Sequence, residues 1–202
     1  MEIRQLEKRD APQFSALIVN MYSHLDNLEW FTPMPYDLEN VEGMIAHPRF
    51  YIIGAFEDGK LVGVSSLDYK CGKLIGKVDF PADCDTEKLV EIGFNLVHFD
   101  FRGRKIMQQL IGVLLEKIKK DGFEWVFTKV HEDNIASNKS CFNKGFEEWC
   151  HLKKEVDKAE FKALSEAAFF SKTGKENAKL TLDKFKNCDK IIVEYNILLK
   201  KL

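Results

Sequence analysis

The fold of this chain is decided by the stretch Val97-His98-Phe99-Asp100-Phe101-Arg102-Gly103-Arg104-Lys105-Ile106-Met107. An apolar run ends here in a short polar turn with one glycine and three cations, and the chain then enters a long amphipathic segment. This pattern predicts a strand that runs into the N-terminus of a helix. Unpaired N–H groups and the positive end of the helix dipole at such a junction favour the binding of an anion.

The composition narrows the class of protein. The chain has 202 residues, of which 45% are hydrophobic and 31% are charged, and this fits a single domain with an ordinary core. The formal net charge of -2 argues against a nucleic-acid partner, because general nucleic-acid binders carry a large basic excess. No apolar run approaches the about 20 residues that span a bilayer, and residues 1–6 alternate like a strand rather than a signal peptide, so no membrane partner is expected.

The cysteines indicate the compartment. They are odd in number and scattered, with no Cys-x-x-Cys motif: Cys71, Cys84, Cys141, Cys150 and Cys188. This pattern fits a reduced, cytoplasmic location in which thiols serve as small hydrophobic groups. His131, Glu132 and Asp133 stand in one loop, too close in sequence for a convincing metal site, so no metal is expected.

Hydrophobic periodicity predicts the elements on either side of the opening stretch. Helices are expected at residues 10–22, 37–47, 104–120 and 134–143, and strands at 1–6, 50–56, 61–67, 89–97, 125–130 and 191–199. An Asp-Gly turn joins the second and third strands. The segment 153–187 is charged and helical in character. We therefore expect one α+β domain over residues 1–202, with a helical insertion at about 153–187 before the last strand.

Several short motifs follow one another between residues 89 and 146. They are Val97-His98-x-Asp100-x-Arg102-Gly103, then Gly122-Phe123, Asn134-x-x-Ser137 and Gly145-Phe146. Their order and spacing resemble the GNAT superfamily of acyl-CoA-dependent N-acyltransferases. The resemblance implies an α/β/α layered fold with a mixed, mostly antiparallel sheet, a central splayed parallel pair and helices on both faces.

The resemblance also implies acetyl-CoA as the cosubstrate. The family motif Gln/Arg-x-x-Gly-x-Gly/Ala begins here at Arg102, and its two small positions fall on Lys105 and Met107. Backbone N–H groups carry most of the binding and any residue except proline supplies them, so we expect coenzyme A binding to survive. The pyrophosphate would lie on Gly103, Arg104, Lys105, Ile106, Met107 and Gln108.

The rest of coenzyme A is expected along the preceding strand. The backbone of Asn95, Leu96 and Val97 would pair with the pantetheine arm like an extra strand. A main-chain N–H near Val97 would polarise the thioester carbonyl. Asn134 would touch the pantetheine or stabilise its own loop.

Two side chains are candidates for proton transfer. Glu91 stands six residues before Val97, where histone-modifying members of the superfamily carry a general base, and even spacing would turn both residues to one face of the strand. The alternative for Glu91 is an edge or salt-bridged carboxylate. Cys141 stands where the family commonly has a tyrosine that protonates the leaving thiolate. It is either that acid or a residue of the helix core. His98 and His131 are either solvated or titrating groups near the cofactor.

The residues expected to bind the acceptor amine are predicted from their positions rather than from a motif. Trp30 and Phe31 lie in an aromatic segment that either forms an apolar substrate wall or packs on the core as a loop. Ser66, with its neighbours Ser65 and Asp68, lies on the strand next to residues 89–97 and would line the acceptor pocket.

Two functions from different classes are consistent with the sequence. The first is an N-acetyltransferase that moves an acetyl group from acetyl-CoA to an amine of a small molecule or peptide by direct attack. The second is a non-catalytic acyl-CoA-binding or regulatory module, which the departures at Lys105, Met107 and Cys141 favour. Transfer of a longer acyl group is a further alternative. The terminal strand would pair within the chain or across a homodimer.

Overall fold

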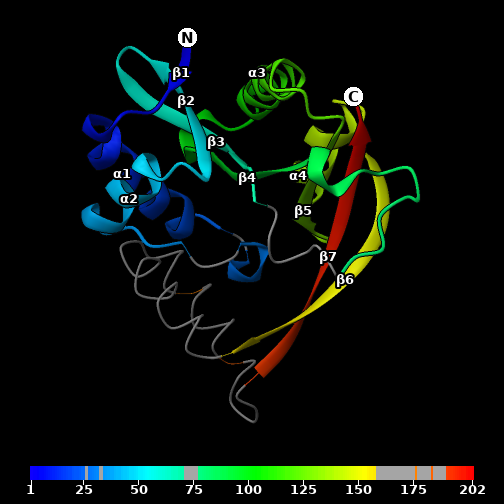
Figure 1. Cartoon of the computed structure of the whole chain (residues 1–202). Coiled ribbons are helices and arrows are strands. Elements are labelled where there is room, and N and C mark those ends of the chain that lie inside the picture. The colour runs from blue at the N-terminus through cyan, green and yellow to red at the C-terminus, as the bar shows by residue number, and fades with distance from the viewer. Residues whose placement is uncertain (26, 32–33, 71–76, 158–175, 177–182, 184–189) are drawn as a thin grey trace.

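The fold is built on one mixed sheet with the strand order β1-β2-β3-β4-β5-β7-β6 (Figure 1). The computed structural model describes residues 1–25, 27–31, 34–70, 77–157, 176, 183 and 190–202. The strands are β1 (Glu2–Gln5), β2 (Phe50–Glu57), β3 (Lys60–Asp68), β4 (Leu89–Val97), β5 (Trp125–His131), β6 (Glu147–Asp157) and β7 (Lys190–Lys201). Only β4 and β5 pair in parallel, and every other neighbouring pair of this sheet is antiparallel. The expected mixed sheet with one central parallel pair is therefore confirmed.

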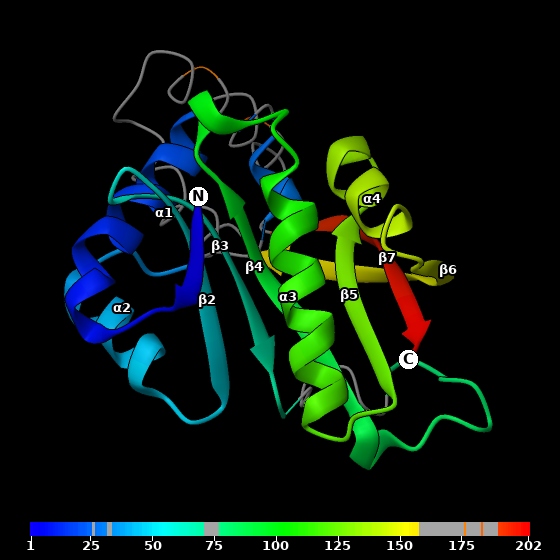
Figure 2. The same cartoon turned by 90° about the horizontal axis from the view of Figure 1, so that it is seen from above.

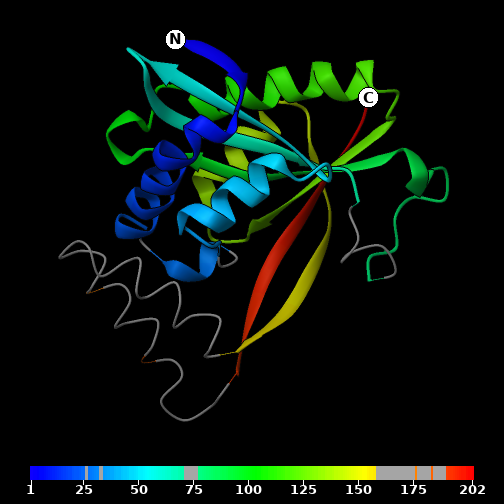
Figure 3. The same cartoon turned by 60° about the vertical axis from the view of Figure 1, so that its left-hand side comes forward.

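Helices cover both faces of the sheet, as expected. They are α1 (Ala11–Ser23), α2 (Leu38–Ala46), α3 (Ile106–Lys120) and α4 (Ile135–Phe142). Figure 3 shows α3 on one side of the sheet and α1 and α2 on the other, and Figure 2 shows α4 beside α3. Each side has its own apolar core: one cluster joins α1 to the sheet, and a second joins α3 to the opposite face.

The long helix α3 lies close to the sheet at a glycine. A Cβ atom at Gly63 of β3 would lie 2.9 Å from Cγ2 of Ile106, so a side chain there would push the first turn of α3 away. The stripe of α3 that faces the sheet is almost fully buried: Ile106, Leu110, Ile111, Leu114 and Ile118. The sequence placed the start of this helix at residue 104, whereas α3 begins at Ile106.

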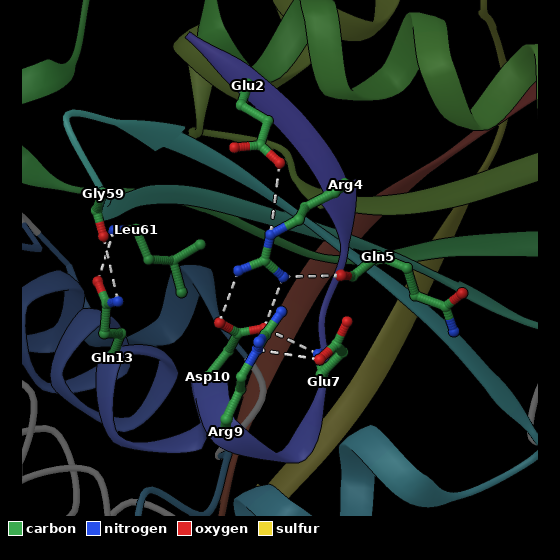
Figure 4. A network of polar contacts seen from close by, with 9 residues as sticks. All are labelled: Glu2, Arg4, Gln5, Glu7, Arg9, Asp10, Gln13, Gly59 and Leu61. Atoms are coloured by element: carbon green, nitrogen blue, oxygen red, sulfur yellow. Dashed lines mark hydrogen bonds and ion pairs between the residues drawn. The ribbon is translucent and has the colours of Figure 1, made fainter.

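A polar network fixes the N-terminal strand to the start of α1 (Figure 4). Arg4 donates two hydrogen bonds to the carboxylate of Asp10, at 2.7 and 2.8 Å, and the backbone N–H of Glu7 donates to the same carboxylate at 2.8 Å. Gln13 of α1 bridges the β2–β3 hairpin, because its amide donates to the carbonyl of Gly59 and accepts from the N–H of Leu61. These bonds join β1, α1 and the hairpin into one unit.

One strand differs from the sequence expectation. Residues 153–157, expected to begin a helical insertion, form the second half of β6 and pair with β7. Apart from Glu176 and Asp183, the rest of the expected insertion lies outside the described residues. The terminal strand β7 pairs on both of its edges within the chain, with β5 and β6. Among the described helices, none has the length and apolar character needed to cross a membrane.

Candidate active site

The parallel strands β4 and β5 separate in the middle of the sheet. They pair only from Leu89↔Trp125 to Glu91↔Phe127. Beyond that point β5 continues as far as His131 against β7, while β4 continues against β3. Within the part of the chain that the structure describes, no strand pairs with the β5-facing edge of β4 from residue 92 onward. We call this opening the splay.

A bulge in β4 coincides with the start of the splay. Phe94 has a positive φ of 48°, and the pairing with β3 shifts by one residue between Glu91↔Asp68 and Val97↔Gly63. β3 is regular between Gly63 and Asp68, and these two residues, five apart, therefore face opposite sides of the sheet. Glu91 shares the face of its partner Asp68, and Val97 shares the face of its partner Gly63. The expectation that Glu91 and Val97 share a face is therefore wrong, and the inserted residue is the reason.

The same register decides which backbone groups of β4 face the splay. The N–H of His98 donates to the carbonyl of Val62 on β3 at 2.9 Å. Because backbone groups alternate between the two edges of a regular strand, Leu96 also bonds toward β3. Val97 therefore directs its N–H and C=O groups into the splay, and Asn95, which lies next to the bulge, directs its C=O group there. Two of the three residues expected to pair with pantetheine therefore have the required orientation. Leu96 does not, and its side chain is fully buried.

The turn before α3 presents backbone donors. The first helical bond of α3 runs from the N–H of Gln109 to the carbonyl of Lys105, so the three preceding N–H groups have no acceptor within the helix. Gly103 and Lys105 both have positive φ, 78° and 61°. This conformation costs little for glycine and more for lysine. It explains why a small residue suits position 105.

The side chains of this turn have different partners. Arg102 donates to the backbone carbonyl of His24 at 3.3 Å. Arg104 stacks 4.7 Å above the ring centroid of Phe101 and lies 3.4 Å from the carboxylate of Glu57. Both arginines are exposed. The anion site at this turn therefore depends chiefly on its backbone N–H groups, with the cations around it.

The second departure from the family motif, Met107, is partly buried. Met107 packs against the apolar cluster under α3, so its side chain turns toward the sheet. Ile106 is 3% exposed and belongs to the same cluster. The residues at these positions therefore contribute backbone N–H groups and core packing. The neighbouring Gln108 is only partly buried.

Glu91 lies in a group of four charged side chains on the α1 side of the sheet. Lys129 of β5 reaches its carboxylate at 3.0 Å. Asp68, the cross-strand neighbour of Glu91, pairs with Arg49, whose Nε donates at 2.6 Å and whose Nη2 donates to the other oxygen. Burial raises the pKa of Glu91 above its ordinary value, and the Lys129 ammonium opposes this shift. Glu91 is thus a salt-bridged carboxylate, which the sequence left open as the alternative to a general base.

The predicted acceptor residues lie on this same side. Ser66 faces Gly93 across the β3–β4 pair, it is 1% exposed, and its hydroxyl has no partner among the described residues. Trp30 and Phe31 pack against the α1-side cluster. The short 3-10 helix that ends at Trp30 contacts β5. Core packing is therefore part of the role of this aromatic segment, and it lies on the face that carries Glu91.

Helix α4 contributes two predicted residues with structural partners. Asn134 caps the helix, because its side chain accepts from the N–H of Ser137 at 3.2 Å. Cys141 is 1% exposed in the core, and burial raises its pKa to about 12. A thiol of this pKa is a poor proton donor to a coenzyme A thiolate, so packing accounts for Cys141. Asn138, which sequence reasoning missed, donates to the carbonyl of His131 at 3.1 Å and holds this loop.

Both histidines accept hydrogen bonds from the backbone close by. His98 accepts from the N–H of Asp100 at 3.3 Å, and burial lowers its pKa. His131 accepts from the N–H of Asp133 at 3.1 Å and meets the ring of Tyr195 edge-on. These contacts fix the turns at the ends of β4 and β5.

Besides Asn138, two residues and one backbone feature of the site were missed from the sequence. Lys129 and Arg49 carry no motif, and their roles follow only from the sheet register. The bulge at Phe94 had one weak signal, because an isolated glycine inside a strand, here Gly93, often marks such an irregularity.

Comparisons with known proteins agree with this geometry. The family model described as the acetyltransferase (GNAT) family matches residues 14–146. No curated protein matches the chain in sequence. Its fold is similar to that of a ribosomal-protein-alanine N-acetyltransferase from Brucella melitensis, at 18% identity over 100% of both chains and a TM-score of 0.66.

Two further solved structures have the same fold. A putative acetyltransferase from Salmonella typhimurium, solved with its cofactor acetyl-CoA, aligns at 14% identity over 100% of this chain and 94% of that one, with a TM-score of 0.65. A PaiA N-acetyltransferase from Thermoplasma acidophilum, solved with coenzyme A, aligns at 15% identity over 100% and 98%, with a TM-score of 0.59. Because the family model covers about two thirds of the sequence, the chain belongs to the acetyltransferase (GNAT) family.

Proposed function

We propose that this protein is an N-acetyltransferase that moves an acetyl group from acetyl-CoA to an amine of a small molecule or peptide. The observation that carries the proposal is the open edge of β4, which is followed, after the short 3-10 helix Phe99–Phe101 and a turn, by the N-terminus of α3. An open strand edge suits an extended chain with amide groups, and a free helix N-terminus suits a phosphate. Pantetheine followed by pyrophosphate has both parts in that order.

Binding would use main-chain groups at both ends of the site. Val97 offers its N–H and C=O groups, and Asn95 its C=O group, to the pantetheine amides, as the register of Val97 and Leu96 with β3 implies. The N–H groups at the start of α3 and the exposed Lys105 offer donors and charge to the pyrophosphate. Two structural neighbours, solved with acetyl-CoA and with coenzyme A, support this ligand class.

The reaction needs a base, and Glu91 lies on the face of the sheet opposite α3. In the proposed reaction the amine nitrogen attacks the thioester carbon, the C–N bond forms, the C–S bond breaks, and coenzyme A leaves as a thiolate. Glu91 takes the proton of the amine, directly or through a water molecule. The Val97 N–H stabilises the negative charge that develops on the carbonyl oxygen. The acceptor would lie near Ser66, Trp30 and Phe31.

The non-catalytic module remains the second candidate, because one observation favours it. Cys141 is packed in the core at the position where the family commonly carries a tyrosine acid. A coenzyme A thiolate is, however, a good leaving group without an acid, so the loss of the acid alone does not abolish transfer.

The test compares Val97→Pro with Val97→Ala. Proline removes the N–H that points into the splay and leaves the bonds of β4 to β3 intact, whereas alanine keeps the N–H. Thiol release from acetyl-CoA is measured with a panel of amines, and coenzyme A affinity is measured by calorimetry. We expect turnover in the parent and in Val97→Ala, and a loss of at least tenfold in Val97→Pro. Coenzyme A binding without turnover on any amine would favour the module, and absence of coenzyme A binding would contradict both functions.

A further inference from the structure

The ion pair of Lys129 and Glu91 crosses the splay at its start. Phe127 is the last residue of β5 that pairs with β4, and its partner is Glu91. Lys129 stands two residues further on, where the backbones have separated, and alternation turns its side chain to the face of Phe127. Its ammonium nevertheless lies 3.0 Å from the Glu91 carboxylate. A side-chain contact thus spans the gap where backbone pairing has ended.

The charges around Glu91 come from three elements. Lys129 belongs to β5 and Asp68 to β3, and Arg49 is the residue immediately before β2. Asp68 already has two hydrogen bonds from the guanidinium of Arg49, so these two neighbours largely offset one another at Glu91. Lys129 is therefore the cation that balances the Glu91 carboxylate.

Without the Lys129 ammonium, the Glu91 carboxylate would be protonated over a wider range of pH. Its side chain is 12% exposed, and burial of a carboxylate without compensation favours the protonated form, which accepts no proton. A base in this position needs a nearby positive charge that is itself able to stay in contact with solvent. The side chain of Lys129, 34% exposed, meets this requirement.

We propose that Lys129 is a positioning residue that holds the Glu91 carboxylate at the mouth of the splay and keeps it ionised for proton transfer. The inference rests on the proposed function, in which Glu91 is the base. The alternative role is a purely structural one, in which the same contact only joins β4 to β5. The two roles differ in what they do to the titration of Glu91.

The experiment follows Glu91 directly by NMR on protein with labelled glutamate carboxyl carbons, with its signal identified by loss in Glu91→Gln. Lys129→Met keeps the aliphatic stem and removes the charge, and Lys129→Arg keeps the charge. The matched control is Lys153→Met, which breaks another lysine–glutamate pair between strands, 2.8 Å from Glu194. We expect the Glu91 titration to move up by about one pH unit or more in Lys129→Met, to stay near the parent value in Lys129→Arg, and to be unchanged in Lys153→Met.

The pH dependence of thiol release provides the second readout. The acidic limb of kcat/KM should move upward with the NMR titration in Lys129→Met. An unchanged Glu91 titration in Lys129→Met would overturn the inference, even if Glu91→Gln is inactive. If no amine supports turnover, the proposed function fails, and the NMR titration still decides whether Lys129 controls the ionisation of Glu91.

Discussion

Two buried carboxylates of this protein, each with a cationic partner, have opposite properties. Asp10 accepts two hydrogen bonds from Arg4 and one from the backbone of Glu7 (Figure 4), and the Arg4 hydrogen bonds are the main cause that lowers its pKa. Glu91 has the Lys129 ammonium as its close cation, and burial raises its pKa. A fully hydrogen-bonded carboxylate is fixed as an anion, whereas a carboxylate held by one exposed lysine can gain and lose a proton.

The largest expected effect is the loss of turnover in Glu91→Gln. The amide keeps the shape of the side chain and cannot accept the amine proton, so kcat should fall by about 10²- to 10⁴-fold. Coenzyme A affinity, measured by calorimetry, should stay within about twofold of the parent, because binding uses main-chain groups. Turnover within threefold of the parent would remove Glu91 as the base.

The corresponding substitution in the Arg4–Asp10 pair should affect stability rather than turnover. Asp10→Asn removes the anion that Arg4 and the Glu7 N–H share, and we expect the free energy of unfolding to fall by about 2 kcal/mol. Urea denaturation followed by fluorescence measures this loss. The kcat of the folded protein should equal that of the parent. A catalytic defect without a stability defect would contradict the assignment of Asp10 to structure.

The two carboxylates should also give stability opposite dependences on pH. The pKa of Asp10 is lowered on folding, so its contribution is present above the ordinary Asp value and is lost as pH falls through the folded value. The pKa of Glu91 is raised, so folding is favoured below its ordinary value, and this advantage is lost as pH rises to the folded value. Urea titrations from pH 4 to pH 8 should therefore show Glu91→Gln gaining stability relative to the parent as pH rises. Asp10→Asn should lose most at neutral pH, and parallel curves for the two variants would contradict this difference.

The smallest effect concerns a cation that belongs to neither pair. Lys105 is exposed and adopts a left-handed backbone conformation. Lys105→Gly should therefore stabilise the fold by up to about 1 kcal/mol. Coenzyme A affinity should fall by less than tenfold, because the backbone N–H groups remain. Thermal unfolding and calorimetry provide the two measurements. A loss of stability would show that the Lys105 side chain has a structural role comparable to those of the paired charges.

The sequence predicted most of the sheet and helices because their periodicity is strong. The strands from 50 to 68 alternate around an Asp-Gly turn, and the helix of residues 106–120 has an apolar stripe. Strand β6 was missed because its sequence is charged and a register shift between Glu148 and Cys150 interrupts its alternation. Its conformation is determined by pairing with β7, which lies far away in sequence.

The candidate site was predictable in its backbone and less so in its side chains. The turn before α3 was predictable because a strand, a polar turn with a glycine and an amphipathic helix follow one another within a few residues. The side of the sheet on which Glu91 lies relative to Val97 was not predictable, because the bulge at Phe94 inserts one residue and reverses the alternation of side chains beyond it. The partnership with Lys129 depends on how β5 aligns with β4, and local sequence carries no information about that register.

Glu91, the carboxylate with one lysine partner, is the proposed base of the reaction. The most direct measurement is kcat/KM for thiol release from acetyl-CoA as a function of pH, in the parent and in Glu91→Gln. With Glu91 as the base, the parent rate falls with a single-proton slope as pH drops through a value above the ordinary glutamate pKa, and the residual rate of Glu91→Gln lacks this limb. An acidic limb that persists unchanged in Glu91→Gln would show that Glu91 is not the base.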